Sequence, residues 1–149
     1  MYNDPPFSSP KKEIPTAMGF RAEFDPANKI LLLRIEGRFT DELAAEVYRA
    51  IRKYSIATDA SAGIFDCSSV TAFAVSPDFI RQLARQEPSM PDALRRPRII
   101  VAPTALGFGL ARMFQIMGEP TRPLLQVVRS LEEALAAPGV QSQPFEPLQ

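Results

Sequence analysis

The chain has 149 residues, of which 46% are hydrophobic and 23% charged, a composition typical of one globular domain. Lysine and arginine together number 17, as do aspartate and glutamate, so the net charge of zero excludes a protein that binds polyanions over its whole surface. There is no histidine and one cysteine, Cys67. These counts exclude histidine-dependent catalysis, histidine zinc sites, an intramolecular disulfide and multi-cysteine metal centres. We therefore expect no metal and no cofactor.

Proline-rich segments flank the predicted domain. Residues 1–16 predict a flexible N-terminal arm, and residues 141–149 predict a flexible C-terminal tail. A single α/β domain is expected over residues 17–140. No segment reaches the roughly 18–20 apolar residues of a membrane span, and the N-terminus lacks the apolar core of a signal peptide. The expected location is the cytoplasm.

The first half of the domain predicts a hairpin followed by a helix. Residues 20–25 alternate between apolar and charged side chains, and residues 29–36 (KILLLRIE) predict a more fully buried strand. Gly37 is expected to end that second strand. Thr40 is the predicted N-cap of a helix, because two acidic residues and then an apolar helical stripe follow it.

Strands and helices alternate through the rest of the domain. Residues 61–67 predict a short buried strand, Ser76-Pro77 the start of a second helix, and residues 97–103 an apolar strand. Thr104 is the predicted cap of a third helix, in which one face carries Leu106, Leu110, Met113 and Met117. A strand at 124–128 and a short helix opened by a Ser130/Glu133 capping box complete the series.

The predicted order is therefore ββαβαβαβα. This order is typical of an α/β fold with a mostly parallel sheet, an N-terminal antiparallel hairpin and helices that cover the sheet.

Three short motifs occur in this order of elements: Gly37-Arg38-Phe39-Thr40, Ile64-Phe65-Asp66 and residues 128–134 (VRSLEEA). Together they resemble the SpoIIAA-like (STAS-like, STAS/SEC14) family of small bacterial proteins. The resemblance covers about residues 18–140 and implies the SpoIIAA-like fold of bacterial anti-sigma-factor antagonists. In those antagonists a serine of an Asp-Ser-Ser-Gly motif, at a helix N-terminus, is the phosphorylation switch. The resemblance places Ser76 at that serine, within Ala74-Val75-Ser76-Pro77, and so implies a phosphosite. A plain N-cap is the alternative role.

Two further positions are candidates for ligand binding. Asp66 is predicted at the carboxyl end of a buried strand, where ligands of open α/β sheets bind; it either contacts a ligand or organises the loop through Ser68 and Ser69. Thr104 precedes a Gly-x-Gly at a helix start, which lacks the third glycine of a dinucleotide fingerprint and the lysine of a P-loop. Anion binding there and close helix packing are the two interpretations. Cys67 is expected to be a small buried group and not a nucleophile.

Arginine is concentrated in the second half of the chain. Between residues 79 and 130, eight arginines face three acidic residues: Arg81, Arg85, Arg95, Arg96, Arg98, Arg112, Arg122 and Arg129. They form either a surface for an acidic partner or a set of solvated side chains. Nucleic-acid binding is not expected, because few aromatic residues are interleaved with them.

The predicted third helix is apolar on more than one face. Core packing accounts for one stripe among Phe108, Met113, Phe114, Ile116 and Met117, and the excess predicts an interface or a pocket. The favoured hypothesis is a non-enzymatic regulatory module that presents residues 76–85 and 104–117 to a protein partner or to a second copy as a homodimer. The alternative is a small-molecule or lipid carrier with an apolar pocket beside the third helix. An enzyme that uses Asp66 and an arginine is the third hypothesis.

Overall fold

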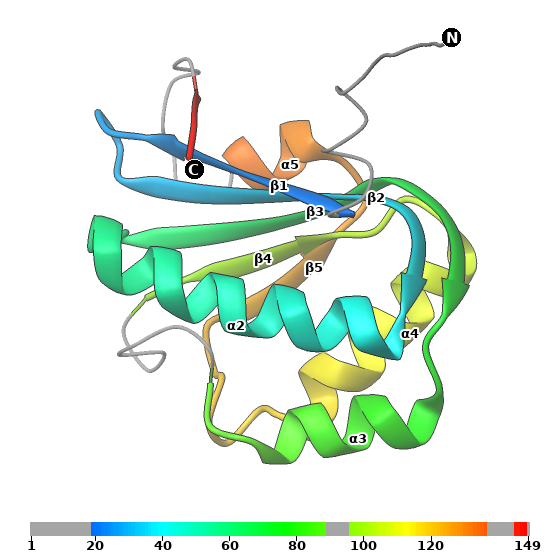
Figure 1. Ribbon diagram of the computed structural model, residues 1–149. Coiled ribbons are helices and arrows are strands. Elements are labelled where there is room, and N and C mark those ends of the chain that lie inside the picture. The colour runs from blue at the N-terminus through cyan, green and yellow to red at the C-terminus, as the bar shows by residue number, and fades with distance from the viewer. Residues whose placement is uncertain (1–18, 89–95, 137–144, 149) are drawn as a thin grey trace, which may run out of the picture.

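A six-stranded sheet in the order β5-β4-β3-β2-β1-β6 forms the centre of the computed structural model, which describes residues 19–88, 96–136 and 145–148 (Figure 1). The strands are β1 (Phe20–Asp25), β2 (Ile30–Thr40), β3 (Ala62–Ala74), β4 (Arg98–Val101), β5 (Leu125–Val128) and β6 (Glu146–Pro147), and the helices are α2 (Asp41–Thr58), α3 (Pro77–Arg85), α4 (Ala105–Met117) and α5 (Leu131–Ala136). Strands β2 to β5 are parallel, whereas β1 is antiparallel to both of its neighbours.

The fold class predicted from the sequence is confirmed. The opening hairpin, the alternation of strands and helices, and the mostly parallel sheet are all present. Strand β6 was not predicted: it lies within residues 141–149, where composition predicted a flexible tail, and pairs with Glu23 and Phe24 of β1. The predicted arm at residues 1–16 lies outside the described residues.

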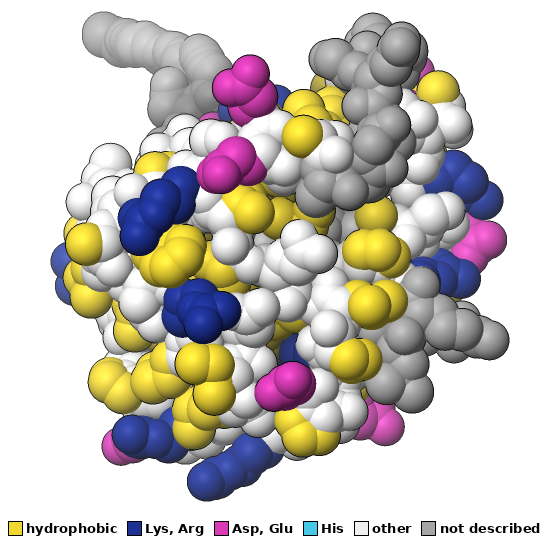
Figure 2. Space-filling view, turned by 180° about the vertical axis from the view of Figure 1, so that it is seen from behind, with side chains coloured by type: hydrophobic (Ala, Val, Ile, Leu, Met, Phe, Trp, Pro, Cys, Tyr) yellow, Lys and Arg dark blue, Asp and Glu magenta, His cyan; other side chains and the backbone are white. Residues whose placement is uncertain are grey.

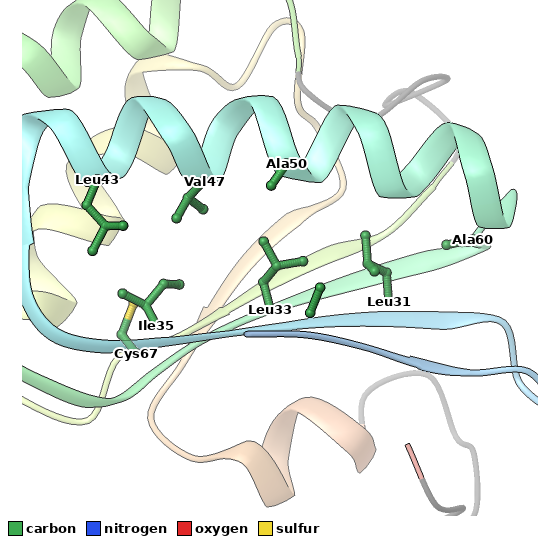
Figure 3. Packing of buried hydrophobic residues seen from close by; sticks show 9 residues of the cluster. Leu31, Leu33, Ile35, Leu43, Val47, Ala50, Ala60 and Cys67 are labelled. Atoms are coloured by element: carbon green, nitrogen blue, oxygen red, sulfur yellow. The ribbon is translucent and has the colours of Figure 1, made fainter. Parts of the chain in front are cut away.

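Helices cover both faces of the sheet, because the buried strands carry apolar side chains on both sides. The two faces are covered by different numbers of helices. Helices α2, α3 and α4 lie on one face and α5 on the other (Figure 1). Leu31, Leu33 and Ile35 of β2 point toward Leu43 and Val47 of α2 (Figure 3). Ile30 and Leu32, whose side chains point to the other face of the sheet, pack in the cluster that contains Ala134 of α5.

Strands β2 and β3 are longer than predicted, and Gly37 does not end β2. Gly37 adopts φ 79°, a conformation that a side chain disfavours, and the pairing with β3 shifts register directly after it. The two strands therefore continue as a bent pair beyond the end of β4, whose last partner in β3 is Asp66.

The inner face of α4 is not the one predicted from the stripe of Leu106, Leu110, Met113 and Met117. The buried residues of α4 are Gly107 and Ala111. An added Cβ at Gly107 would lie 2.7 Å from Cζ of Phe73, so this face packs against its neighbours without room for a larger side chain. Of the predicted stripe, Leu106 and Met117 are exposed to solvent, and Leu110 and Met113 are half-buried. The small residues Gly107 and Ala111 face the sheet instead, because they allow the helix to approach it closely.

Candidate functional site: the α4 face and two internal cavities

The outward side of α4 exposes large hydrophobic side chains. Leu106 is 59% exposed, Ile116 60% and Met117 39%, while Met113 is half-buried. Thr104 caps the helix, because its Oγ1 accepts a hydrogen bond from the Gly107 amide at 3.1 Å. We call the exposed side of α4, formed by Leu106, Met113, Ile116 and Met117, the α4 face.

Positive charge lies beside the α4 face. Arg112, the one charged residue in α4, precedes Ile116 by one helical turn. The Arg129 guanidinium lies 3.9 Å from the centroid of the ring of Phe108, a residue of α4 outside the α4 face. In the view from behind, hydrophobic side chains lie beside Lys and Arg side chains on the side of the molecule that α4 occupies (Figure 2). The face thus joins apolar area to a basic border.

Ser76 is an exposed N-cap of α3. Its Oγ accepts a hydrogen bond from the Phe79 amide at 3.1 Å, and its own amide donates to Oδ1 of Asp41 at 3.2 Å. Asp78 adds a second carboxylate in the first turn of the helix. The capping role expected of Ser76 is observed, and its phosphorylation stays a prediction.

Asp66 does not lie at the end of a strand, as predicted, but in the middle of β3, because β3 extends to Ala74. Its Oδ1 accepts hydrogen bonds from the amide and Oγ of Ser68, at 3.0 and 2.6 Å, and its Oδ2 lies 3.5 Å from Nη1 of Arg34. Ser69 is exposed and pairs with Glu36 in the sheet. Asp66 and Ser68 are therefore brought together, with a local organising contact, whereas Thr104 is engaged in its own helix cap.

An apolar cavity of about 80 Å³ lies beside α4. We call it the α4 cavity. Of the four candidate pocket residues, Phe114 lines it and Phe108, Met113 and Met117 do not. Its other lining residues come from all three helices of this face and from the sheet, and include Tyr48, Ile80, Leu83 and Leu110.

A second cavity, of about 50 Å³, lies between α2, α4 and the strands β2 to β5. We call it the inner cavity. Its lining is apolar except for Arg98, Ser55 and Tyr48, while Phe65, Phe114 and Ile100 border both cavities. Sequence reasoning missed this cavity, because its walls come from residues between 31 and 125.

Two arginines that the sequence grouped with the surface charges are buried. Arg122 is 1% exposed and Arg98 is 9% exposed, so neither interpretation of the arginine set fits them. For Arg98 the signal was available: it precedes Ile100 by two residues in an apolar strand and shares its side of the sheet. Arg122 follows a helix end, where no periodic pattern indicates burial. Arg95 lies outside the described residues.

Arg122 joins three helices. It donates to the carbonyls of Leu83, Ala84 and Gln86 at the end of α3, and to Oη of Tyr48 in α2 at 2.8 Å. Its guanidinium lies 4.9 Å from the centroid of the Phe114 ring in α4. The buried charge is satisfied mainly by carbonyl dipoles, as a cation at a helix C-terminus is.

Cys67 is buried, as expected of a small apolar group. Burial raises the pKa of its thiol to about 12, with a further contribution from the charge of Asp66. Within residues 19–88, 96–136 and 145–148, no group of three or more metal-ligating side chains is present, and no helix has the length and apolarity to cross a membrane.

No family model matches this sequence, and no curated protein matches it. Five chains of solved structures match. One of them, described as an anti-sigma factor antagonist from Mycobacterium paratuberculosis, is 17% identical, with a TM-score of 0.49, over 79% of this chain and 91% of that chain.

Proposed function

We propose that this protein is a non-enzymatic regulatory module that binds a protein partner through the α4 face. The observation that carries the proposal is the exposure of Leu106, Ile116 and Met117 along one helix. Apolar area of this kind, with Met and Arg beside it, is typical of the centre and rim of a protein interface.

The partner is expected to carry an apolar ridge with acidic residues around it. Arg112 lies one helical turn from Ile116, at the border of the α4 face, and Arg129 lies over Phe108 of the same helix. Helix α4 itself contains no acidic residue. Pairing the face with a second copy would bring these arginines toward like charges, which is unfavourable. A different, acidic partner is therefore favoured over the homodimer.

The non-enzymatic part of the proposal is supported by the contacts of the candidate catalytic groups. The carboxylate of Asp66 is taken up by Ser68 and Arg34, and the thiol of Cys67 is buried with a raised pKa. Neither group is presented to a substrate with an activating partner.

The size of the α4 cavity disfavours the lipid-carrier alternative. Pockets for drug-sized ligands measure roughly 300–1,000 Å³. The α4 cavity, at about 80 Å³, is too small for an acyl chain without opening of the helix layer. The exposed apolar side chains of α4, Leu106, Ile116 and Met117, do not line this cavity and point outward, where a protein surface can cover them.

The test has two steps. A photoreactive amino acid at position 113 first cross-links the partner in the source cells, so that the partner can be identified. The affinity of the purified protein for that partner is then measured. Ile116→Asp is expected to weaken binding at least about tenfold, because it places a charge in the apolar centre. Ile56→Asp is the matched control: Ile56 is also 60% exposed, but on α2. The affinity of the Ile56→Asp variant for the partner is expected to be unchanged.

Equal affinity in the two variants would overturn the α4 face as the binding surface. Binding that does not weaken with added salt would contradict the acidic character of the partner. Size-exclusion chromatography with light scattering on the same variants measures self-association. A dimer that Ile116→Asp disrupts would favour the second copy instead.

Phosphorylation of Ser76 is proposed as the regulatory step. Its exposed hydroxyl caps α3, and a phosphate there would lie near the carboxylates of Asp41 and Asp78, so that α3 would be perturbed at its start. The intact mass of protein isolated from its source is expected to show one phosphate that Ser76→Ala removes. An unmodified mass under all growth conditions would contradict this role.

A further inference from the structure

The inner cavity contains a buried cation with no anion beside it. Arg98 lines the cavity and is 9% exposed. Its Nε and Nη2 atoms are buried and have no hydrogen-bond partner, and no carboxylate among the described residues forms an ion pair with it. A buried, unpaired guanidinium is costly, and native proteins rarely retain one without a use.

The sheet register directs Arg98 into this space. Arg98 alternates with Ile99 along β4, so it shares the side of Ile100, which faces α4. Its partner in β3 is Gly63, which has no side chain, and its partner in β5 is Leu125. Both partners line the same cavity, so the position opposite the arginine is left open.

A second donor without a partner lines the cavity from α2. Ser55 is 1% exposed, and its Oγ has no hydrogen-bond partner among the described residues. A serine in this position of a helix commonly bonds to its own backbone, so an orphaned hydroxyl at a cavity wall is a second, independent sign of a missing acceptor. Arg98 and Ser55 come from β4 and α2, which the fold alone brings together.

The unsatisfied atoms have the geometry that a carboxylate requires. The Nε and Nη2 hydrogens of a guanidinium are parallel and match the two oxygens of a carboxylate as a bidentate pair. The remaining walls are apolar and include Leu33, Ile51 and Phe114. A phosphate, with more oxygens and more charge, would leave acceptors without donors there.

We propose that the inner cavity binds a small monocarboxylate, whose carboxylate accepts hydrogen bonds from Nε and Nη2 of Arg98 and from Oγ of Ser55. Its short apolar body lies against Leu33, Ile51 and Phe114. The volume of about 50 Å³ fits a ligand of a few carbon atoms and not a fatty acid. The guanidinium remains charged for this purpose at neutral pH, since its pKa of about 10 is lowered mainly by burial and then by the charge of Arg122.

The site goes beyond the proposed function, and its test does not depend on the protein partner. Purified full-length protein is titrated with acetate, butyrate and benzoate by calorimetry and thermal unfolding. One carboxylate is expected to bind with one-to-one stoichiometry and to raise the Tm. Butyramide, which has the shape of butyrate without its charge, and inorganic phosphate are expected to have no effect.

Two variants assign the binding to the cavity. Arg98→Met is expected to abolish the carboxylate-dependent Tm shift and to raise the Tm of the ligand-free protein, because it replaces an unpaired buried charge by an apolar side chain of similar length. Ser55→Ala is expected to weaken binding about tenfold, and it keeps the test intact if Arg98→Met does not fold. Arg85→Met, a change of an exposed arginine in α3, is the matched control and is expected to retain the full shift.

Three binding results and one stability result would overturn the proposal. The binding results are the absence of a Tm shift with all three carboxylates, a shift that persists in both Arg98→Met and Ser55→Ala, and a response to phosphate as large as that to butyrate. The response to phosphate would indicate a general anion effect on the protein. A ligand-free Arg98→Met protein that is markedly less stable than the wild type would assign Arg98 a structural role instead.

Discussion

Replacement of Arg122 by methionine is predicted to destabilise the protein strongly. Arg122 is the buried residue through which the end of α3, the middle of α2 and the inner side of α4 are held together. Methionine retains much of the apolar stem but removes every donor. The change therefore tests whether the charge at this position stabilises the fold, in contrast to the charge of Arg98.

The expected loss is about 4 kcal/mol. Hydrogen bonds from a charged donor contribute roughly 1.5–3 kcal/mol each. Arg122 makes three to backbone carbonyls, at 2.8, 3.1 and 3.0 Å, and one to Oη of Tyr48. Gln86 is exposed, so water replaces the hydrogen bond to its carbonyl, and the other three bonds at the lower end of the range give about 4–5 kcal/mol. Against a typical total of about 5–15 kcal/mol for a domain, this is a large fraction.

Urea unfolding followed by far-ultraviolet circular dichroism measures the free-energy difference. Arg81→Met is the matched control, because Arg81 is exposed and pairs with an exposed Asp78, and its change is expected to cost less than about 0.5 kcal/mol. A loss of less than about 1 kcal/mol in Arg122→Met would refute the reasoning. It would mean that hydrogen bonds from water stabilise the freed carbonyl groups as much as the guanidinium does.

Two further predictions concern α4 and the single thiol. Gly107→Ala is expected to lower the free energy of unfolding by about 1–3 kcal/mol, because the new Cβ would meet Phe73. Gly109→Ala is expected to raise it by about 0.5–1 kcal/mol, because the new Cβ would have nothing within 4 Å and alanine favours a helix. Urea unfolding of both variants measures the difference. Cys67 is expected to react with Ellman's reagent in urea but not in the native protein at mildly alkaline pH. Because the folded pKa is about 12 against 9.0 in the unfolded chain, its contribution to stability is full below pH 9.0 and decreases as the pH rises toward 12. Native-state labelling at the unfolded rate would contradict the burial of Cys67.

The sequence by itself determined the start of each helix and the order of the elements. Thr40, Ser76, Thr104 and Ser130 all accept the hydrogen bond expected of an N-cap, from the amide three residues later. A cap depends on the four residues that form it, so it is encoded locally. The hairpin and the parallel strands follow from patterns of comparable length, which is why the α/β class could be predicted.

Only the tertiary structure decided which side chains are buried and which strands continue. The face of α4 that packs inward is chosen by Phe73, and the length of β3 by its partner β2, both far away in sequence. Arg98 and Arg122 are buried because helices from distant parts of the chain close over them. Burial depends on long-range neighbours, so a local pattern such as the apolar strand around Arg98 indicates a side of the sheet but not what covers it. Both the exposed α4 face and the unpaired Arg98 result from these neighbours.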